Sequence, residues 1–282
     1  MLLREVEYAR PATVDEAISL LGEHDGARAL AGGQTLVSVM KARAAAPDVL
    51  VDLQDLDELR EIRFSADGML EIGAMVTYAQ LMASSEVDVA RPILAEVAGT
   101  IADVQVRNRG TVGGNVCVAD PTNHLPPLLV ALDATFTVQG QGGERTVSAE
   151  DFFLGVYMTA VGEGELLTKI SIPASSGAGD GFAGLTLGRH GTYLVNAAAT
   201  VSDGGVRIAL GCVDAVPVRA TAMEERLSSG DFSEATVRAA AEGLGAALDP
   251  PGDVHASAEY RRSLAETSAV RAILQAAGRR KG

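Results

Sequence analysis

The sequence predicts an α+β fold with more than one domain. The chain has 282 residues, which is more than one compact hydrophobic core usually holds. Helix-like and strand-like patterns follow one another without the regular strand–helix–strand period of a parallel α/β fold. A segment rich in glycine and serine, residues 173–184, divides the pattern late in the chain.

The first part of the chain, up to about residue 56, is expected to form a small α/β unit. Thr13 and Glu16 have the spacing of a capping box, and apolar residues then repeat at helical intervals as far as Leu21. Three elements should follow: a buried strand at 27–31, a helix at 36–43 and a second strand at 49–53. Gly32 and Gly33 then lie in the turn between the first strand and the second helix.

The middle of the chain alternates strand and helix signals around one long glycine-bearing stretch. The predicted elements are a strand at 69–74, a helix starting near Thr77, a helix at 92–102 and a strand around 136–138. Residues 109–127 carry several glycines and prolines, so we expect a long loop there.

The last part of the chain should form a hairpin followed by helices. Residues 173–184 are interpreted as a flexible linker or an exposed turn, and the domain boundary is placed there. Two apolar runs, 194–201 and 206–213, are separated by Ser-Asp-Gly-Gly, which is typical of a β-hairpin. Helices are predicted at 233–248 and 257–277.

Charge and composition exclude several classes of function. The net charge of −14 disfavours binding to nucleic-acid phosphates or anionic lipid, although a local pocket for one phosphate-bearing cofactor remains compatible with it. Cys117 and Cys212 are too few to bind an iron–sulfur cluster, and the four histidines are scattered, so no metal site is expected in this chain. No apolar run suits a membrane span or a signal peptide, and a cytoplasmic protein is expected.

The segment Ala31-Gly32-Gly33-Gln34-Thr35-Leu36 is the first candidate site. Adjacent glycines permit positive φ and close approach of a ligand to the backbone. Successive N–H groups in such a turn can bind an anion, and the hydroxyl of Thr35 adds a donor. The segment therefore suits a pyrophosphate, and the alternative is a tight strand-to-helix turn without a ligand.

A second glycine segment, Arg107 to Asn115, reads RNRGTVGGN. It differs from the G-x-G-x-x-G fingerprint of dinucleotide-binding folds. Thr111 and Asn115 flank its glycine pair, Gly113 and Gly114, and two such segments in one chain suit a long cofactor with a pyrophosphate. A purely structural role is the alternative here as well.

Other polar residues are weaker candidates. Asp120 either accepts from the hydroxyls of a cofactor or closes an Asx turn before Pro121. Arg189, His190 and Tyr193 either face a cofactor or are solvated. The chain has no G-x-S-x-G elbow, no G-x-x-x-x-G-K-[ST] loop and no local Ser/His/Asp set, so no catalytic residue is predicted.

Both glycine segments carry a family resemblance. AGGQTL (31–36) and RNRGTVGGNVCVADP (107–121), in this order, resemble the FAD-binding subunits of the xanthine dehydrogenase and carbon monoxide dehydrogenase family of molybdenum hydroxylases. Further likenesses, such as PPLLVALDA (126–134), LTKISIP (167–173) and RIALGCVDAVPVRA (207–220), extend the resemblance over nearly the whole chain.

The resemblance implies a domain plan and a set of FAD-binding residues. The plan is a two-lobed, PCMH-type FAD-binding domain at 1–176, with lobes at about 1–56 and 57–176, followed by a C-terminal domain of carbon monoxide dehydrogenase flavoprotein type at 177–282. The flavin ring would lie between the two domains. The implied FAD-binding residues are Ala31, Gly32, Gly33, Gln34, Thr35, Leu36, Ile101, Ala102, Thr111, Gly113, Gly114, Asn115, Asp120, His124, Leu167 and Tyr193.

The resemblance also implies partners. A large subunit would hold the molybdopterin cofactor and a small subunit two [2Fe–2S] clusters. By analogy with the family, the three subunits would assemble as a dimer of heterotrimers. FAD in this chain would pass electrons from the clusters to an external acceptor. His124 departs from the family, because many relatives have Asp there in DPxxDLP, and a histidine can only accept when neutral or else donate.

The alternative function is a stand-alone FAD oxidase of the vanillyl-alcohol-oxidase-like type. Such an oxidase needs a substrate cavity with a base, and sometimes a histidine or cysteine that links the flavin covalently. His124 and Cys117 are the candidates for that link near a glycine segment.

Overall fold

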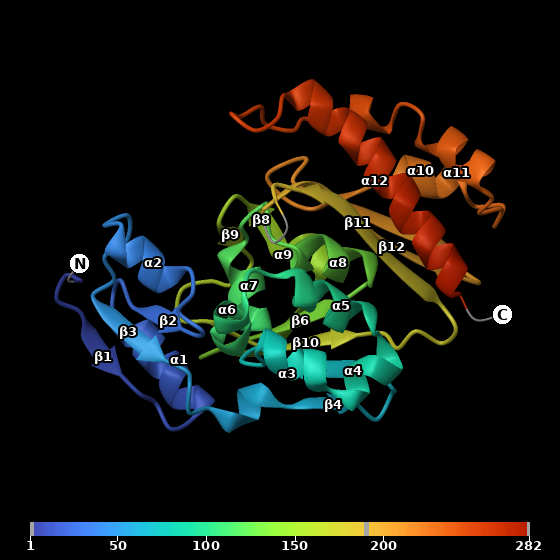
Figure 1. Cartoon of the computed structure of the whole chain (residues 1–282). Coiled ribbons are helices and arrows are strands. Elements are labelled where there is room, and N and C mark those ends of the chain that lie inside the picture. The colour runs from blue at the N-terminus through green and yellow to red at the C-terminus, as the bar shows by residue number, and fades with distance from the viewer. Residues whose placement is uncertain (1–2, 189–191, 281–282) are drawn as a thin grey trace.

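A computed structural model describes residues 3–188 and 192–280. It confirms the predicted α+β class, with three main sheets that are each covered by helices (Figure 1). Within the described residues, no helix combines the length and apolar character needed to cross a bilayer.

The N-terminal unit is a three-stranded parallel sheet in the order β1 (Glu7–Ala9), β3 (Val49–Asp52), β2 (Arg28–Leu30). Helix α1 (Val14–Glu23) packs on it and α2 (Leu36–Lys41) follows the glycine turn. The predicted start of α1 is confirmed, because the Thr13 side chain accepts from the backbone N–H of Glu16 at 3.1 Å. The Glu16 carboxylate reaches back to the N–H of Ala12.

The second unit is built on a five-stranded antiparallel sheet. Its order is β4 (Ile62–Phe64), β5 (Leu70–Gly73), β10 (Leu166–Ile172), β6 (Thr135–Gly140), β7 (Gly143–Ser148). Strand β10 lies at the centre although it is last in sequence, so the chain must return to the middle of the sheet after forming the edge strands. A large shared core joins the sheet to its helices.

The helices of this unit lie before, within and after the second glycine segment. They are α3 (Tyr78–Ala83), α4 (Ser85–Ala90), α5 (Ile93–Thr100), α6 (Val104–Arg109), α7 (Val112–Val118), α8 (Leu125–Ala131) and α9 (Ala149–Phe152), with a 3-10 turn η1 at Asp57–Arg60. A two-stranded hairpin, β8 (Phe153–Gly155) and β9 (Met158–Thr159), follows α9.

The prediction of a long loop at residues 109–127 is wrong. Helix α7 and the first turn of α8 occupy most of it. Thr111 caps α7 by accepting from the N–H of Gly114, and Val112 and Val116 are buried in the core. Packing of this short helix therefore overrides the poor helix propensity of its glycines.

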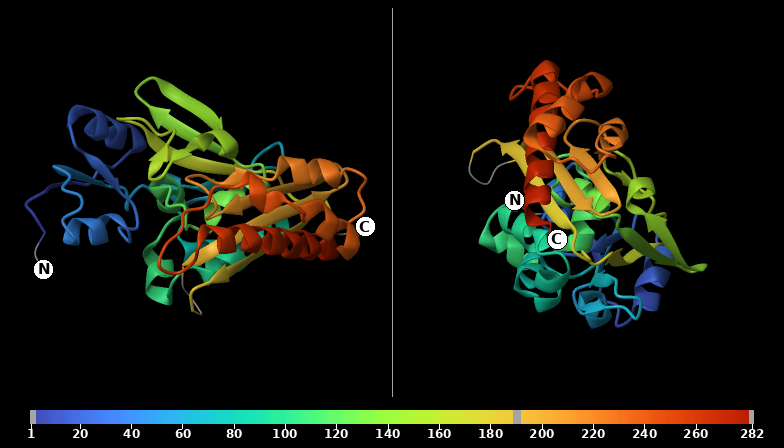
Figure 2. Two further views of the ribbon diagram at one scale, coloured as in Figure 1. Left: turned by 90° about the horizontal axis from the view of Figure 1, so that it is seen from above. Right: turned by 90° about the vertical axis from the view of Figure 1, so that its right-hand side faces the viewer.

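The third unit is a four-stranded antiparallel sheet in the order β11 (Gly179–Thr186), β12 (Tyr193–Ser202), β13 (Gly205–Gly211), β14 (Val218–Arg219). The hairpin predicted from residues 194–213 is confirmed, with Ser202 paired to Gly205 at its turn. The helix predicted at 257–277 is confirmed as α12 (Ala258–Arg279). It lies along the sheet, with α10 (Thr221–Arg226) and α11 (Glu234–Ala241) beside it (Figure 2).

Two predictions in this part are corrected. The segment 173–184 is not a linker throughout, because β11 begins at Gly179. A Cβ at Gly179 or Gly181 would collide with the backbone of α12, so these glycines permit close packing of helix on strand. The helix predicted at 233–248 breaks after α11, where Gly243 has φ +80° and starts the 3-10 turn η2 (Leu244–Ala247).

A buried ion pair connects the second and third units. Arg91 donates to the Asp180 carboxylate at 2.8 Å and to the carbonyl of Pro173 at 2.8 Å, while Thr200 donates to the same carboxylate at 2.9 Å. Arg91 and Asp180 are 5% and 6% exposed, so both charges depend on these contacts for solvation. Helix α8 also packs on β12 and β13, which fixes the third unit against the second.

Candidate cofactor site

A hollow of about 950 Å³ lies between the N-terminal unit and the helices α6 and α7. This volume is at the upper end of the range typical for cofactor sites. Both glycine segments line it, and Figure 1 shows the blue N-terminal unit facing the green helices across this region. Twelve predicted residues line it: Ala31, Gly32, Gly33, Gln34, Thr35, Leu36, Ile101, Thr111, Gly113, Gly114, Asn115 and Leu167.

The first glycine segment presents unused backbone donors. Gly33 has φ +71°, and the segment turns from β2 into α2. The backbone N–H groups from Gly32 to Thr35 donate to no acceptor among the residues that the structure describes. Such a run of free N–H groups along a hollow suits an anionic group such as a pyrophosphate.

The second glycine segment differs, because its backbone donors are already used. The N–H groups of Val112, Gly113, Gly114 and Asn115 donate to Val76 O, Ala74 O, Thr111 Oγ1 and Thr111 O, respectively. A Cβ on Gly113 would lie 2.6 Å from both the carbonyl oxygen and the Cβ of Ala74. This glycine therefore brings α7 against the end of β5, and a ligand can meet only the side chains and surface of the segment.

The two segments also touch each other. A Cβ on Gly32 would collide with the carbonyl of Arg109, and a Cβ on Gly114 would lie 3.6 Å from the Cβ of Ala31. The absence of side chains at these points lets the N-terminal unit close against α6 and α7. The glycines thus shape the hollow as well as lining it.

Asn115 supplies an unused acceptor to the hollow. The side chain is 9% exposed, and its Oδ1 is buried without a hydrogen-bond partner among the described residues. A buried acceptor without a partner is costly, which favours a ligand donor at this position. Tyr78 lies beside it, and burial raises the pKa of the Tyr78 hydroxyl to about 12 against the opposing effect of a hydrogen bond with Asn115.

FAD suits this set of groups. Its pyrophosphate can accept from the free N–H groups of Gly32 to Thr35, and its hydroxyl and amino groups can donate to Oδ1 of Asn115. Ile101 and Leu167 contribute apolar side chains to the wall of the hollow. No cluster of three or more metal-ligating side chains occurs in the described residues.

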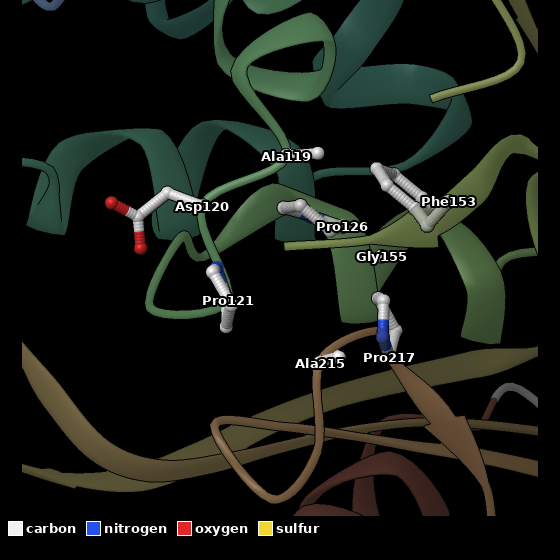
Figure 3. A pocket seen from close by; sticks show the side chains of 8 residues that line it. All are labelled: Ala119, Asp120, Pro121, Pro126, Phe153, Gly155, Ala215 and Pro217. Atoms are coloured by element: carbon white, nitrogen blue, oxygen red, sulfur yellow. The ribbon is translucent and has the colours of Figure 1, made fainter. Parts of the chain in front are cut away.

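Four predicted residues do not line the hollow: Ala102, Asp120, His124 and Tyr193. Asp120 borders a separate cavity of about 10 Å³, which is close to the room that one water molecule needs (Figure 3). Its carboxylate accepts from Thr122 N at 2.9 Å, from Thr122 Oγ1 at 2.7 Å and from the Tyr157 hydroxyl at 3.2 Å. The structure thus favours the Asx-turn interpretation of Asp120.

His124 and Tyr193 form a pair at the junction with the third unit. Their rings meet edge to face, with centroids 4.7 Å apart. Burial lowers the pKa of His124 to about 4, so the imidazole is neutral at pH 7, and its Nε2 has no partner among the described residues. Burial also raises the pKa of Tyr193, opposed by a hydrogen bond with Thr100. The predictions for Arg189 and His190 fall outside the described residues.

Several lining residues were not expected. They include residues 21–22 and 24–29 before the first glycine segment, the hairpin residues Tyr157, Met158 and Thr159, and the turn from Gly162 to Leu166. Cys117 also lines the hollow and is accessible. The Gly162-Glu163-Gly164 turn was a usable signal, whereas the hairpin residues are brought to the hollow by tertiary packing alone.

Comparison with known proteins assigns the family. Residues 4–175 match the family described as the FAD binding domain in molybdopterin dehydrogenase, and residues 192–276 match the CO dehydrogenase flavoprotein C-terminal domain. The chain belongs to the FAD-binding subunits of the molybdenum hydroxylase family. The resemblance given by the two glycine segments is confirmed, and the chain is an FAD-dependent oxidoreductase subunit.

Individual relatives match the sequence of this FAD-binding subunit over nearly its whole length. It is 38% identical to the carbon monoxide dehydrogenase medium chain of Hydrogenophaga pseudoflava, covering 97% of each chain. It is 28% identical to the xanthine dehydrogenase FAD-binding subunit of Escherichia coli O157:H7, covering 95% of each.

Solved structures show the same fold. A carbon monoxide dehydrogenase from Hydrogenophaga pseudoflava superposes with a TM-score of 0.95 at 38% identity, covering 99% of this chain and 100% of the other. Quinoline 2-oxidoreductase from Pseudomonas putida 86 gives a TM-score of 0.94 at 36% identity, covering 99% of each chain.

Proposed function

We propose that this chain binds FAD in the hollow and carries electrons within a multi-subunit molybdenum hydroxylase. Electrons would come from [2Fe–2S] clusters of a small partner subunit, after a large molybdopterin subunit has oxidised the substrate. They would leave FAD for an external acceptor. The observation that carries the proposal is the row of free N–H groups from Gly32 to Thr35 along a hollow of suitable size, in a chain of this family.

The residues divide by what they would do for FAD. Gly32 to Thr35 would bind the pyrophosphate through backbone N–H groups, and Thr111 and Asn115 would meet the body of the cofactor with their side chains. Ile101 and Leu167 would exclude water from its apolar parts. When bound, FAD supplies the redox chemistry, and the protein supplies binding, orientation and electrostatics.

The predicted residues that do not line the hollow would act at its edge or at the junction between units. Ala102 adjoins the lining residue Ile101, and His124 with Tyr193 lies at the junction between the second and third units, where we expect the flavin ring. Because His124 is neutral at pH 7, it would offer the flavin one acceptor or one donor and no charge. Asp120 already has three donors, so we expect it to position the loop that precedes His124.

The wider arrangement is also part of the proposal. We divide the chain into an FAD-binding domain at 1–176, with lobes at about 1–56 and 57–176, and a C-terminal domain at 177–282. Support comes from the separate hydrophobic cores of the N-terminal and third units. We further propose assembly with the large and small subunits as a dimer of heterotrimers in the cytoplasm, by analogy with medium chains of this family.

The first test is optical. The purified chain should be yellow or should become yellow with added FAD, with the absorption bands of bound flavin. A chain that stays colourless and does not bind added FAD would contradict the proposal. Flavin that stays on the chain after denaturation would instead favour the oxidase alternative, since Cys117 is accessible in the hollow.

A second test concerns the partners. The native complex should co-purify with two further subunits and should contain molybdenum and iron. Reduction of the complex by its substrate should bleach the flavin absorption. A chain isolated from its native source without partners or metals would leave FAD binding standing but contradict the electron-transfer role.

A further inference from the structure

Arg107 occupies an unusual position beside the hollow. It lies on α6, and one guanidinium nitrogen, Nη1, donates to the carbonyl oxygens of both Ile101 and Ala102 at 2.9 Å. No carboxylate among the described residues forms an ion pair with it. Its charge is therefore used to bind backbone, in contrast to most arginines of this chain that bind carboxylates.

The backbone that Arg107 holds is strained. Ile101 has φ −75° and ψ 118°, and Ala102 has φ +44°. These angles resemble the central residues of a type II turn, whose second central position normally requires glycine. Alanine pays a steric cost in this left-handed region, so the turn needs outside support to persist.

Three further contacts tie the same turn to its surroundings. Asp103 caps α6 by accepting from Val106 N at 2.9 Å, which fixes the helix that carries Arg107. Thr100 donates to Val97 O at 2.7 Å and hydrogen-bonds Tyr193 of the third unit. The turn is thus held from α5, from α6 and from β12, and Arg107 is the only positively charged side chain that binds it among the described residues.

The turn also forms part of the hollow. Ile101 is 7% exposed and lines it, as does Val106 of α6. In a trans peptide the C=O and N–H groups point to opposite sides, so the N–H of Ala102 points away from Arg107 when the Ile101 carbonyl binds it. That N–H has no acceptor among the described residues, and although Ala102 itself does not line the hollow, the N–H belongs to the peptide group that joins Ala102 to the lining residue Ile101.

We propose that Arg107 is a positioning residue for the flavin: it holds the turn at residues 100–103 in its left-handed conformation, which sets the Ile101 wall and keeps the Ala102 N–H free as a hydrogen-bond donor to FAD. The inference rests on the proposed function, because it assumes that FAD occupies the hollow. It assigns to Arg107 a role through the backbone and no contact with the cofactor.

The test uses the full-length chain and FAD titration followed by fluorescence and visible circular dichroism. Arg107→Met should weaken FAD binding about tenfold or more, since hydrogen bonds from a charged group are lost, and should change the circular dichroism of the bound flavin. Arg107→Lys should fall between this variant and the wild type. Arg109→Met is the matched control, because Arg109 lies on the same helix with an exposed side chain that binds none of the described residues.

A second variant separates positioning from charge. Ala102→Gly removes the steric cost of the left-handed conformation, so the turn should depend less on Arg107. Ala102→Gly alone is the reference against which the FAD affinity of the double variant is compared. In the double variant Arg107→Met/Ala102→Gly, most of the lost affinity should return.

Three results would overturn the proposal: unchanged affinity and circular dichroism in Arg107→Met, equal losses in Arg107→Met and Arg109→Met, or no recovery in the double variant. If Arg107→Met does not fold, Arg107→Lys decides on the same measurements. Hydrogen exchange of the amides at 101–103 in the FAD-free chain gives an independent measurement, and should be faster in Arg107→Met. A wild-type chain that does not bind FAD would refute the proposed function, while the exchange result would still test the support of the turn.

Discussion

The two glycine pairs of this chain look alike in sequence and differ in structure. At Gly32 and Gly33 the chain turns and leaves four backbone N–H groups from Gly32 to Thr35 without acceptors in the described residues. At Gly113 and Gly114 the chain is helical, and every N–H from Val112 to Asn115 has an acceptor. We therefore propose that the first pair serves a ligand directly, whereas the second serves packing that builds the wall of the same hollow.

This difference shows that a glycine pair has two separate uses. Positive φ, as at Gly33, changes the direction of the backbone and exposes its donors. A missing side chain, as at Gly113, lets two backbones approach closely while the conformation stays ordinary. Substitutions should therefore affect ligand binding at the first pair and folding at the second.

The largest expected effect is on folding, with Gly113→Ala. The new Cβ would lie 2.6 Å from the Ala74 carbonyl oxygen, and both partners are backbone-fixed, so the free energy of unfolding should fall by about 3 kcal/mol. Chemical denaturation measures this loss. Gly142→Ala is the control, because nothing lies within 4 Å of its Cβ. A Gly113→Ala variant as stable as the control would show that the second pair is not a packing device.

The next effect is on binding, with Gly33→Val. A β-branched residue at φ +71° is strained, and its Cβ would lie 3.3 Å from Val37, so the segment should shift and lose FAD. Gly68→Val provides the matched control, since Gly68 has φ +81° with open space around it and lies away from the hollow. Both variants should lose about 1–2 kcal/mol of stability. Full FAD occupancy in Gly33→Val would refute the assignment of the first pair.

The smallest effect at pH 7 concerns His124, which ends the stretch that follows the second pair. Its pKa is about 4 in the folded chain against an ordinary 6.5, because burial disfavours the charged form. The unfolded chain therefore binds the extra proton, and stability should fall as the pH drops from about 6.5 to about 4.

His124→Gln removes this titration. As the pH drops from about 6.5 to about 4, the variant should lose less stability than the wild type, and the difference should grow by at most about 1.4 kcal/mol per pH unit. Above that window, the curves of stability against pH should be parallel for the two proteins. Thermal denaturation at a series of pH values measures the difference, and the carboxylates that titrate nearby are common to both proteins. Parallel curves through the whole window would show that His124 is not buried in its neutral form.

The elements that the sequence predicts well are those with local signals. Thr13 with Glu16 marks the start of α1, and Ser202 to Gly205 marks the turn of the β12–β13 hairpin. The elements that it misses depend on distant partners. Helix α7 forms in a glycine-rich stretch because Ala74 lies against Gly113, and β11 extends through Gly179 and Gly181 because α12 lies on them. Composition alone cannot distinguish such glycines from those of a loop.

The same reasoning applies to the site. The first glycine segment has a local signal, and twelve of the sixteen predicted residues line the hollow. Tyr157 and its neighbours reach the hollow only because the β8–β9 hairpin folds back, and the support given by Arg107 depends on the conformation of Ala102. Strain and tertiary contact leave no pattern in one sequence.

The buried pair of Arg91 and Asp180 has a consequence for how the protein denatures. Removing either partner would leave a charge stranded in the interior, at a cost of about 3–5 kcal/mol. Because the two residues come from different units, melting of one unit would strand a charge in the other. The second and third units should accordingly melt in a single calorimetric transition, and a fragment that begins at residue 177 should be aggregation-prone by itself.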